Sequence, residues 1–197
     1  MTNLDLSALP LMPIALGAGA LLLVLYAIGV YNRLIALRIR RGQAFADIDV
    51  QLHQRYDLIP NLVEAVRGYA GHEAKVLEAV TAARTRAEGV KGAGADRMKA
   101  EGLLAGALTG LLAVAEAYPD LKADAQFQRL MAELSDVENK IAAARRFFNN
   151  ATQEFNATLA QFPANVVGAL FGFAQEPFFE IEAGQDDRVR ARPDVRF

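Results

Sequence analysis

The sequence predicts an all-α protein in which a single N-terminal transmembrane helix precedes an elongated antiparallel bundle of about four helices. Three observations support this fold class. Residues 8–31 carry no charged side chain, apolar residues then recur at helical spacing, and β-branched runs and Asn-Gly or Asp-Gly turns are rare. We expect the first and last helices of the bundle to be the long ones.

The uncharged stretch has the length of a membrane span. Residues 8–31 number 24, and about 20 helical residues cross a hydrocarbon core of about 30 Å. A cleaved signal peptide is the alternative, but the short N-terminal segment at 1–7 contains Asp5 and no basic residue. We therefore expect an uncleaved transmembrane helix at 8–31.

The charges that flank this span predict its orientation. No basic residue precedes the span, and no acidic residue lies between it and Asp47. The positive-inside rule then places the N-terminus outside and the following domain in the cytoplasm. The same basic side chains suit either a solvated helix or anionic lipid headgroups. These membrane-flanking residues are Arg33, Arg38, Arg40 and Arg41.

Residues 32–162 are predicted to form the helical bundle. The first bundle helix covers about 33–69, and Pro60 lies inside it, where Asp57 can cap a restarted helix. Its apolar seam consists of Phe45, Ile48, Leu52, Ile59, Leu62, Val66 and Tyr69. A second helix is predicted over about 72–87.

The last bundle helix is predicted over 120–162, a stretch without Gly or Pro. Its apolar residues alternate at spacings of 3 and 4, which is the heptad pattern of a coiled coil. A helix this long needs a long partner, and the first bundle helix supplies one. The seam consists of Phe127, Leu130, Leu134, Val137, Ile141, Ala144, Phe148, Ala151, Phe155, Thr158 and Phe162.

Two further stretches are apolar. A third bundle helix is predicted over about 96–118, and its small residues Gly102, Gly106 and Gly110 at four-residue spacing predict close helix packing. We expect a tightly packed, buried helix, with an interfacial or oligomer-forming helix as the alternative. Residues 163–183 contain Phe171 and Phe173 and are expected to fold back on the bundle or on a neighbour, with lipid contact as the alternative. The charged residues 184–197 predict a disordered tail.

The sequence carries no recognisable catalytic set. It has no cysteine, its two histidines form no HExxH motif, and neither GxSxG nor GxxxxGK[ST] occurs. The net charge of -2 gives no basic field for nucleic acid. We expect no enzyme, no metal, no cofactor, no small-molecule substrate and no nucleic-acid partner.

Two polar features stand out within the apolar seams. Arg55 occupies a seam position of the first bundle helix and needs a buried acceptor, such as a helix C-terminus or a carboxylate of the last helix. Asn149 and Asn156 lie seven residues apart beside the last seam. They fit either recognition of another subunit or hydrogen bonding between helices.

Several motifs together resemble the signature of the LemA family. They are Tyr56–Val63 with Pro60 and Asn61, Gly68–Ala70, His72-Glu73, Tyr118–Leu121, Glu138–Asn149, Phe155-Asn156 and Phe171–Phe173. This chain has Phe148 and Phe155 where the family favours tyrosine. The resemblance implies a bacterial membrane protein with one N-terminal span, an elongated helical domain and no established enzymatic activity. It marks Arg55, Asp57, Pro60, Asn61, Asn149 and Asn156 as structural or interaction residues.

These observations lead to one functional hypothesis and two alternatives. The first is a scaffold in the bacterial inner membrane that contacts lipid, self-associates and organises the membrane or proteins in it. The alternatives are an adaptor for a membrane protease or envelope-stress partner, and a protein that remodels the membrane.

Overall fold

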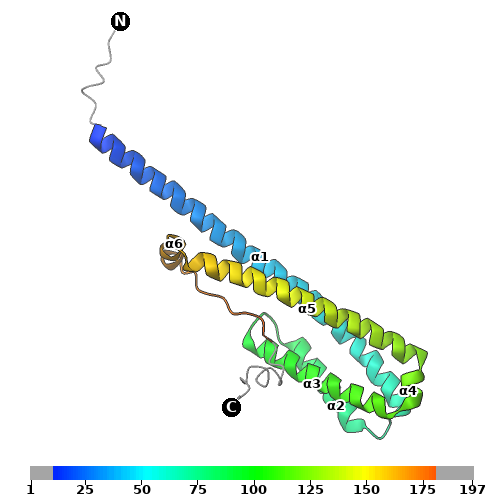
Figure 1. Ribbon diagram of the computed structural model, residues 1–197. Coiled ribbons are helices and arrows are strands. Elements are labelled where there is room, and N and C mark those ends of the chain that lie inside the picture. Colours follow the sequence, from blue (N-terminus) through cyan, green and yellow to red (C-terminus); the bar gives the residue numbers. More distant parts are fainter. Residues whose placement is uncertain (1–10, 181–197) are drawn as a thin grey trace, which may run out of the picture.

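The computed structural model describes residues 11–180, and nearly all of them are helical (Figure 1). No strand occurs within residues 11–180, which confirms the all-α prediction. The predicted segment 1–7 and the predicted tail 184–197 lie outside the described residues. The elements are α1 (Leu11–Tyr69), α2 (Ala74–Gly89), α3 (Ala95–Ala117), α4 (Pro119–Ala123), α5 (Ala125–Ala160) and α6 (Ala164–Leu170).

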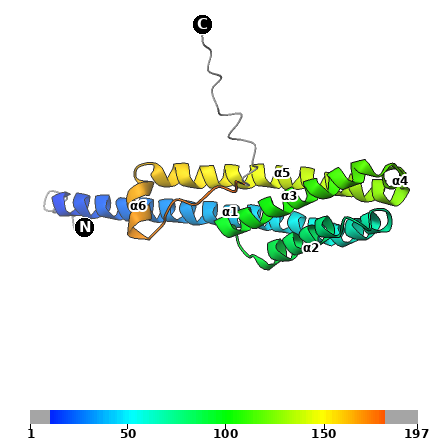
Figure 2. The same cartoon turned by 90° about the horizontal axis from the view of Figure 1, so that it is seen from below.

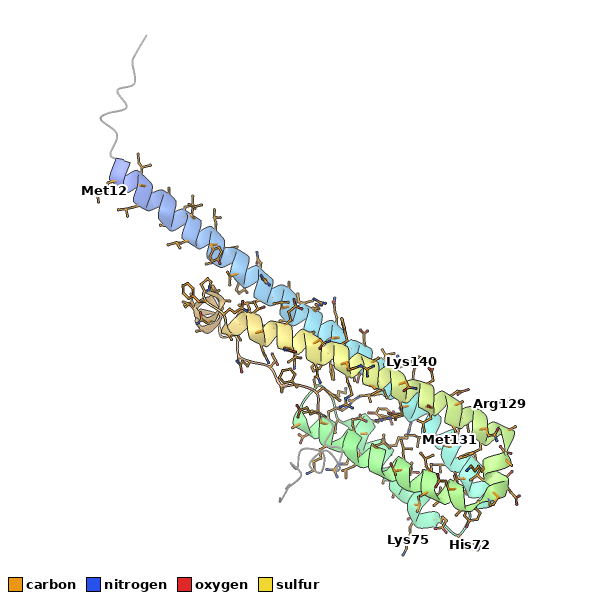
Figure 3. The ribbon with its side chains drawn as sticks, in the orientation of Figure 1. Met12, His72, Lys75, Arg129, Met131 and Lys140 are labelled. Carbon is orange, nitrogen blue, oxygen red and sulfur yellow. The ribbon has the colours of Figure 1, made fainter. Side chains whose placement is uncertain are left out.

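One helix, α1, contains residues 11–31 of the predicted span and the predicted first bundle helix, while residues 8–10 of the span lie outside the described residues. It has 59 residues, which corresponds to about 90 Å. Its N-terminal part projects beyond the other helices, with Met12 near the tip and His72 near the opposite end of the molecule (Figure 3). That part is fully exposed and is long and apolar enough to cross a membrane. The helix α3 is also long and apolar enough to cross a membrane, but a third of its apolar stretch is buried in the bundle.

The helix α5 lies along α1 and runs in the opposite direction (Figure 2). The Tyr69 hydroxyl at the end of α1 donates to Asp124 at the start of α5 at 3.2 Å, while Leu34 packs with Leu159 at the other end. The predicted seams are wrong at Tyr69, which is 45% exposed at the last residue of α1, and at Phe162, which is 83% exposed because α5 ends two residues earlier. The buried seam residues include Ile48, Leu52, Ile59, Leu62 and Val66 of α1 and Phe127, Leu130, Leu134, Val137, Ile141, Phe148, Ala151 and Phe155 of α5.

The predicted continuous helix over 120–162 is divided into α4 and α5 at Asp124. This residue has an extended backbone, with ψ of 124°. Its carboxylate accepts from the backbone N–H groups of Gln126 at 2.9 Å and Phe127 at 2.8 Å. These bonds, the one from Phe127 above all, lower the pKa of the Asp124 carboxyl. A new helix therefore starts here, because its first N–H groups find a cap.

The helix α1 continues through Pro60, so the restart that we expected at Asp57 does not occur. Asp57 is exposed within the helix. Proline has no N–H group, which leaves the carbonyl of Tyr56 without its helical donor. Nε of Arg84 on α2 donates to that carbonyl at 2.7 Å. A bond that ties α2 to α1 thus replaces the missing helical bond.

At Gly106 and Gly110 of α3, no other part of the described chain packs closely against the helix. A Cβ atom added at Gly106 or Gly110 would meet nothing within 4 Å. The same helix exposes 47% of Leu103 and buries the opposite side, which includes Leu104 and Leu108. The close-packing prediction is therefore wrong within one chain for Gly106 and Gly110, because α3 packs through its leucines.

A double-mutant cycle tests the bond between Pro60 and α2. We expect Arg84→Met to lower the free energy of unfolding by about 1 kcal/mol, because the Tyr56 carbonyl loses its donor. In a Pro60→Ala background the restored backbone N–H can serve that carbonyl, so the same change should cost clearly less. Denaturant unfolding of the full chain in detergent, followed by circular dichroism, measures both costs. Equal costs in the two backgrounds would contradict this account.

Candidate functional site

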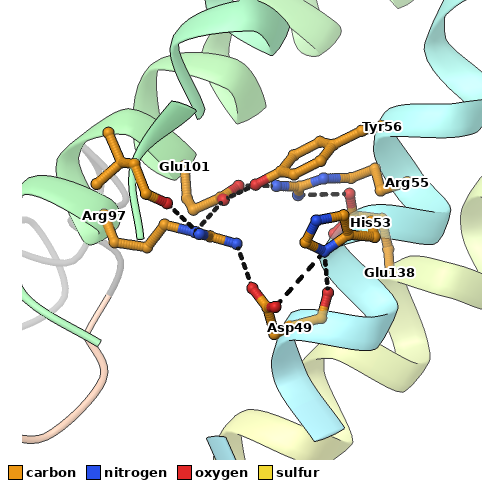
Figure 4. Close-up of polar contacts among 8 residues, drawn as sticks. Asp49, His53, Arg55, Tyr56, Arg97, Glu101 and Glu138 are labelled. Carbon is orange, nitrogen blue, oxygen red and sulfur yellow. Dashed lines mark hydrogen bonds and ion pairs between the residues drawn. The ribbon is translucent and has the colours of Figure 1, made fainter. Parts of the chain in front are cut away.

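Charged side chains are buried where α1, α3 and α5 meet (Figure 4). Arg55 of α1 is 1% exposed, and Arg97 and Glu101 of α3 are 2% and 0% exposed. The carboxylate of Glu101 accepts from Arg55, from the Tyr56 hydroxyl, and from Nε of Arg97 at 3.0 Å. We call Arg55, Tyr56, Arg97 and Glu101 the buried ion cluster.

Two partly exposed carboxylates complete the pairing at the edges of the cluster. Glu138 of α5 accepts from Nη1 of Arg55 at 2.9 Å. Asp49 of α1 accepts from Nη2 of Arg97 at 2.8 Å. Each guanidinium group therefore bridges Glu101 and a carboxylate nearer to solvent. Through these bonds, the cluster joins three helices.

The cluster is costly to bury and stable only when complete. Burial and the hydrogen bond to Glu101 raise the pKa of Tyr56, so that its phenol stays protonated and donates. Nε of Arg55 is buried without a partner in the described chain. Loss of Glu101 would leave Arg55 with Glu138, and Arg97 with Asp49 and the Val90 carbonyl, without the buried carboxylate that both arginines share. Incompletely compensated buried charge is strongly destabilising.

The polar groups of the buried ion cluster bind mainly to one another. Within residues 11–180, no group of three or more His, Cys, Asp or Glu side chains is placed to hold a metal ion. Nδ1 of His53 lies 2.8 Å from the backbone carbonyl of Asp49 in its own helix. The carboxylate of Glu101 is occupied by donors of the cluster itself. The contacts of the buried ion cluster therefore connect α1, α3 and α5 to one another.

A second polar site holds the extended residues 173–180, which we call the C-terminal segment. Asn156 of α5 pairs with both the N–H and the carbonyl of Glu176, each at 2.9 Å. Asn149 pairs in the same way with Phe179, at 2.8 and 3.2 Å. Each side-chain amide thus acts like the peptide group of a neighbouring strand. The partner of these asparagines is the chain's own backbone, which neither alternative from the sequence had included.

Arg41 binds the same segment from α1. It donates to the Thr152 hydroxyl and to the Pro177 carbonyl, at 3.0 Å in both cases, and pairs with Glu176 at 3.2 Å. Burial lowers the pKa of the Arg41 guanidinium, although the Glu176 carboxylate opposes this effect. Arg41 is therefore a structural residue in addition to being a membrane-flanking charge.

The other membrane-flanking arginines lie nearer the surface. Arg40 pairs with Glu154 of α5 at 2.9 Å. Arg38 is exposed and lies 3.9 Å from Glu176, and Arg33 is exposed. The arginines after the apolar stretch thus divide into two that engage α5 or the C-terminal segment closely and two that face outward.

The predicted C-terminal contact residues pack against α1. The Phe171 and Phe173 rings lie 4.7 and 5.8 Å from the Tyr31 ring, measured between centroids. Phe173 also lies 6.4 Å from the Phe155 ring of α5. The chain after α5 therefore folds back onto its own bundle near Tyr31, where the apolar N-terminal part of α1 ends.

Sequence reasoning found Arg55 and gave a carboxylate of the last helix as one possible acceptor, which Glu138 of α5 is. It missed the buried partner Glu101 and the second arginine, Arg97. Arg97 and Glu101 lie four residues apart, a spacing that puts both on one face of a helix. Glu101 is also followed by 14 uncharged residues, which marks it as the edge of a buried stretch. Asp57 and Asn61, by contrast, are exposed on α1 and belong to neither polar site.

Removal of the central charge tests the buried ion cluster. We expect Glu101→Gln to lower the free energy of unfolding by about 3 kcal/mol, because two buried arginines lose their shared partner. Asp136→Asn is the matched control, since it breaks an exposed pair with Lys140 that contributes at most about 0.5 kcal/mol. Denaturant unfolding in detergent compares them. Similar losses in the two variants would show that the cluster is not a lock.

The asparagine pairs can be tested by hydrogen exchange. In Asn156→Ala, we expect the amide of Glu176 to exchange about tenfold faster, because it loses its acceptor. Asn150→Ala is the control, as Asn150 is an exposed neighbour on the same helix. Exchange measured by mass spectrometry on the full chain should change only in the first variant. Unchanged protection at Glu176 would contradict the role of Asn156.

Comparison with known proteins places the chain in a family. The model of the LemA family matches residues 44–197. Magnetosome proteins MamQ 1 and MamQ 2 of Paramagnetospirillum magneticum are each 23% identical over 186 residues, covering 81% of this chain and 68% of theirs. Magnetosome protein MamQ of Magnetospirillum gryphiswaldense is 28% identical over 98 residues, 50% of this chain and 36% of its own. The family match includes both polar sites and most of the chain, and the chain belongs to the LemA family.

Proposed function

We propose that this protein is a membrane-anchored, non-enzymatic scaffold that self-associates through its helical domain and organises the bacterial inner membrane or proteins in it. The observation that carries the proposal is the continuity of α1 from its exposed apolar part into the bundle. A continuous helix transmits the orientation of the span to the bundle. The helical domain therefore stands on the membrane as a rod at a defined angle.

The dimensions support a rod that reaches well away from the bilayer. The part of α1 after Tyr31 has 38 residues, and α5 has 36, so each measures about 55 Å. With the positive-inside rule, this rod lies in the cytoplasm and the N-terminus lies outside. In this proposal the chain crosses the membrane once, and α3 stays in the bundle because Leu104, Leu108 and Leu111 are buried there.

Self-association is supported by the outward face of α3. Residues 102–115 carry no charge, Leu103 is 47% exposed, and open space lies over Gly106 and Gly110. Small residues allow another helix to approach closely. Copies anchored in one plane also have a high effective concentration, so that weak contacts suffice.

The relatives MamQ 1 and MamQ 2 are named as proteins of the magnetosome. The buried ion cluster and the asparagine pairs bind parts of this chain to each other. A scaffold uses such locks because its function depends on a fixed shape.

The size of the full chain in lipid tests the scaffold proposal. We expect oligomers in mild detergent and in nanodiscs, and a shift toward monomer in Gly106→Glu, because a charge then lies on the contact face. Gly68→Glu is the matched control, since Gly68 is also helical with open space around it. Mass photometry measures both. A wild-type chain that is monomeric at micromolar concentration in both environments would refute self-association.

A further inference from the structure

A patch of exposed apolar side chains surrounds α6. Phe162 is 83% exposed, Val166 58%, Leu170 78% and Phe171 58%. Val166 and Leu170 are four residues apart in α6 and therefore lie on one face of this helix, while Phe162 precedes the helix and Phe171 follows it. We call these four residues the α6 patch. Exposed apolar side chains gathered in this way mark an interaction surface.

The position of the α6 patch along the rod is fixed by its contact with α1. Phe171 packs on Tyr31, and Tyr31 is the last residue of the uncharged stretch 8–31. If that stretch fills the hydrocarbon core, Tyr31 lies at the cytoplasmic interface, where aromatic residues are enriched. The patch then lies at the same depth.

The charges around the patch mark the same level. No charged residue occurs between Glu154 and Glu176. Glu154 pairs with Arg40, and Glu176 pairs with Arg41. Charged pairs thus begin on the bundle side of the patch, while the side toward the N-terminus of α1 is apolar and exposed.

The packing holds α6 in place and in one orientation. A Cβ atom at Gly168 would clash with the Leu159 side chain, so α6 lies directly on the end of α5. Gly172, with φ of 72°, ends α6, and the Phe173 N–H donates to the Gly168 carbonyl at 2.9 Å. Figure 1 shows α6 nearly end-on and Figure 2 shows it running across α1 and α5. A helix that crosses a membrane-spanning helix in this way lies along the membrane surface.

We propose that α6 is an interfacial membrane helix whose patch of Phe162, Val166, Leu170 and Phe171 inserts into the headgroup and upper acyl region of the bilayer that α1 spans. The occupant is lipid, because the patch continues the exposed apolar surface of α1 at the depth of Tyr31. A second copy of the chain is the alternative occupant, and the quenching experiment below distinguishes it from lipid. This inference rests on the proposed anchoring by α1.

Depth-dependent quenching tests the proposal on the full chain. The protein has no cysteine, so single cysteines at exposed positions can carry an environment-sensitive fluorophore. Leu170→Cys reports on the patch, Leu22→Cys on the span, and Phe178→Cys on the C-terminal segment as the matched exposed control. Each is reconstituted into phosphatidylcholine vesicles with nitroxide lipids labelled near the headgroup or near the bilayer centre, with iodide as the aqueous quencher.

The expected quenching pattern distinguishes membrane anchoring by α1 from lipid insertion of α6. At Leu170 we expect about a twofold loss of fluorescence with the headgroup nitroxide and less with the central one, because the patch lies at the interface. Leu22 should respond most to the central nitroxide, and Phe178 mainly to iodide. Val166→Cys should repeat the Leu170 result, which guards against a fault of one variant.

Other outcomes overturn the inference in different ways. Quenching at Leu22 without quenching at Leu170 would remove α6 from lipid and leave the anchor intact. Protection of Leu170 from both nitroxides and iodide would indicate that a second copy covers the patch. Equal nitroxide quenching at Leu170 and Phe178 would mean that the whole rod lies on the bilayer. No nitroxide quenching at Leu22 would overturn the anchor and the inference together.

Discussion

The continuity of α1 constrains every other part of the structure. A helix of 59 residues cannot turn back on itself, so its exposed apolar part projects and the other helices pack along the remainder. α5, with 36 residues, matches the length of that remainder and runs antiparallel to it. α2 packs on α1, and α3 packs on α2 and reaches α1 through the buried ion cluster. α6 and the C-terminal segment cover α1 nearer to its apolar part.

Polar contacts that join α2, α3 and α5 to α1 are made by Tyr56 and its neighbour Arg55. Pro60 frees the carbonyl of Tyr56 for Arg84 of α2, and the hydroxyl of the same tyrosine donates to Glu101 of α3. Arg55, the preceding residue, binds Glu101 and reaches α5. Helices that apolar seams alone would allow to slide are thus fixed in register, because each polar contact has a single good geometry.

Sequence periodicity predicted the helices and most of the two long seams, since both follow from local spacing. It could not predict the break at Asp124, because a capping residue and a solvated residue look alike in a sequence without Gly or Pro. It found Arg55 as a buried charge but not Glu101, because pairing between helices depends on their rotation and register. Asn149 and Asn156 stood out by their spacing, yet their partner is an extended segment that has no periodic signal of its own.

The antiparallel course of α5 gives the end of the chain its role. Because α5 runs toward the apolar part of α1, the chain reaches that end of the bundle at about Phe162, and the left-handed turn at Gly172 then sends it back along the bundle. In the proposed arrangement, a single span alone would leave the bundle free to tilt and to rotate about its axis. The proposed lipid contact of α6, placed to one side of α1, would restrict both motions. Neighbouring rods would then present the face around Gly106 at the same height and angle, which is the condition under which weak contacts between scaffold copies can add up.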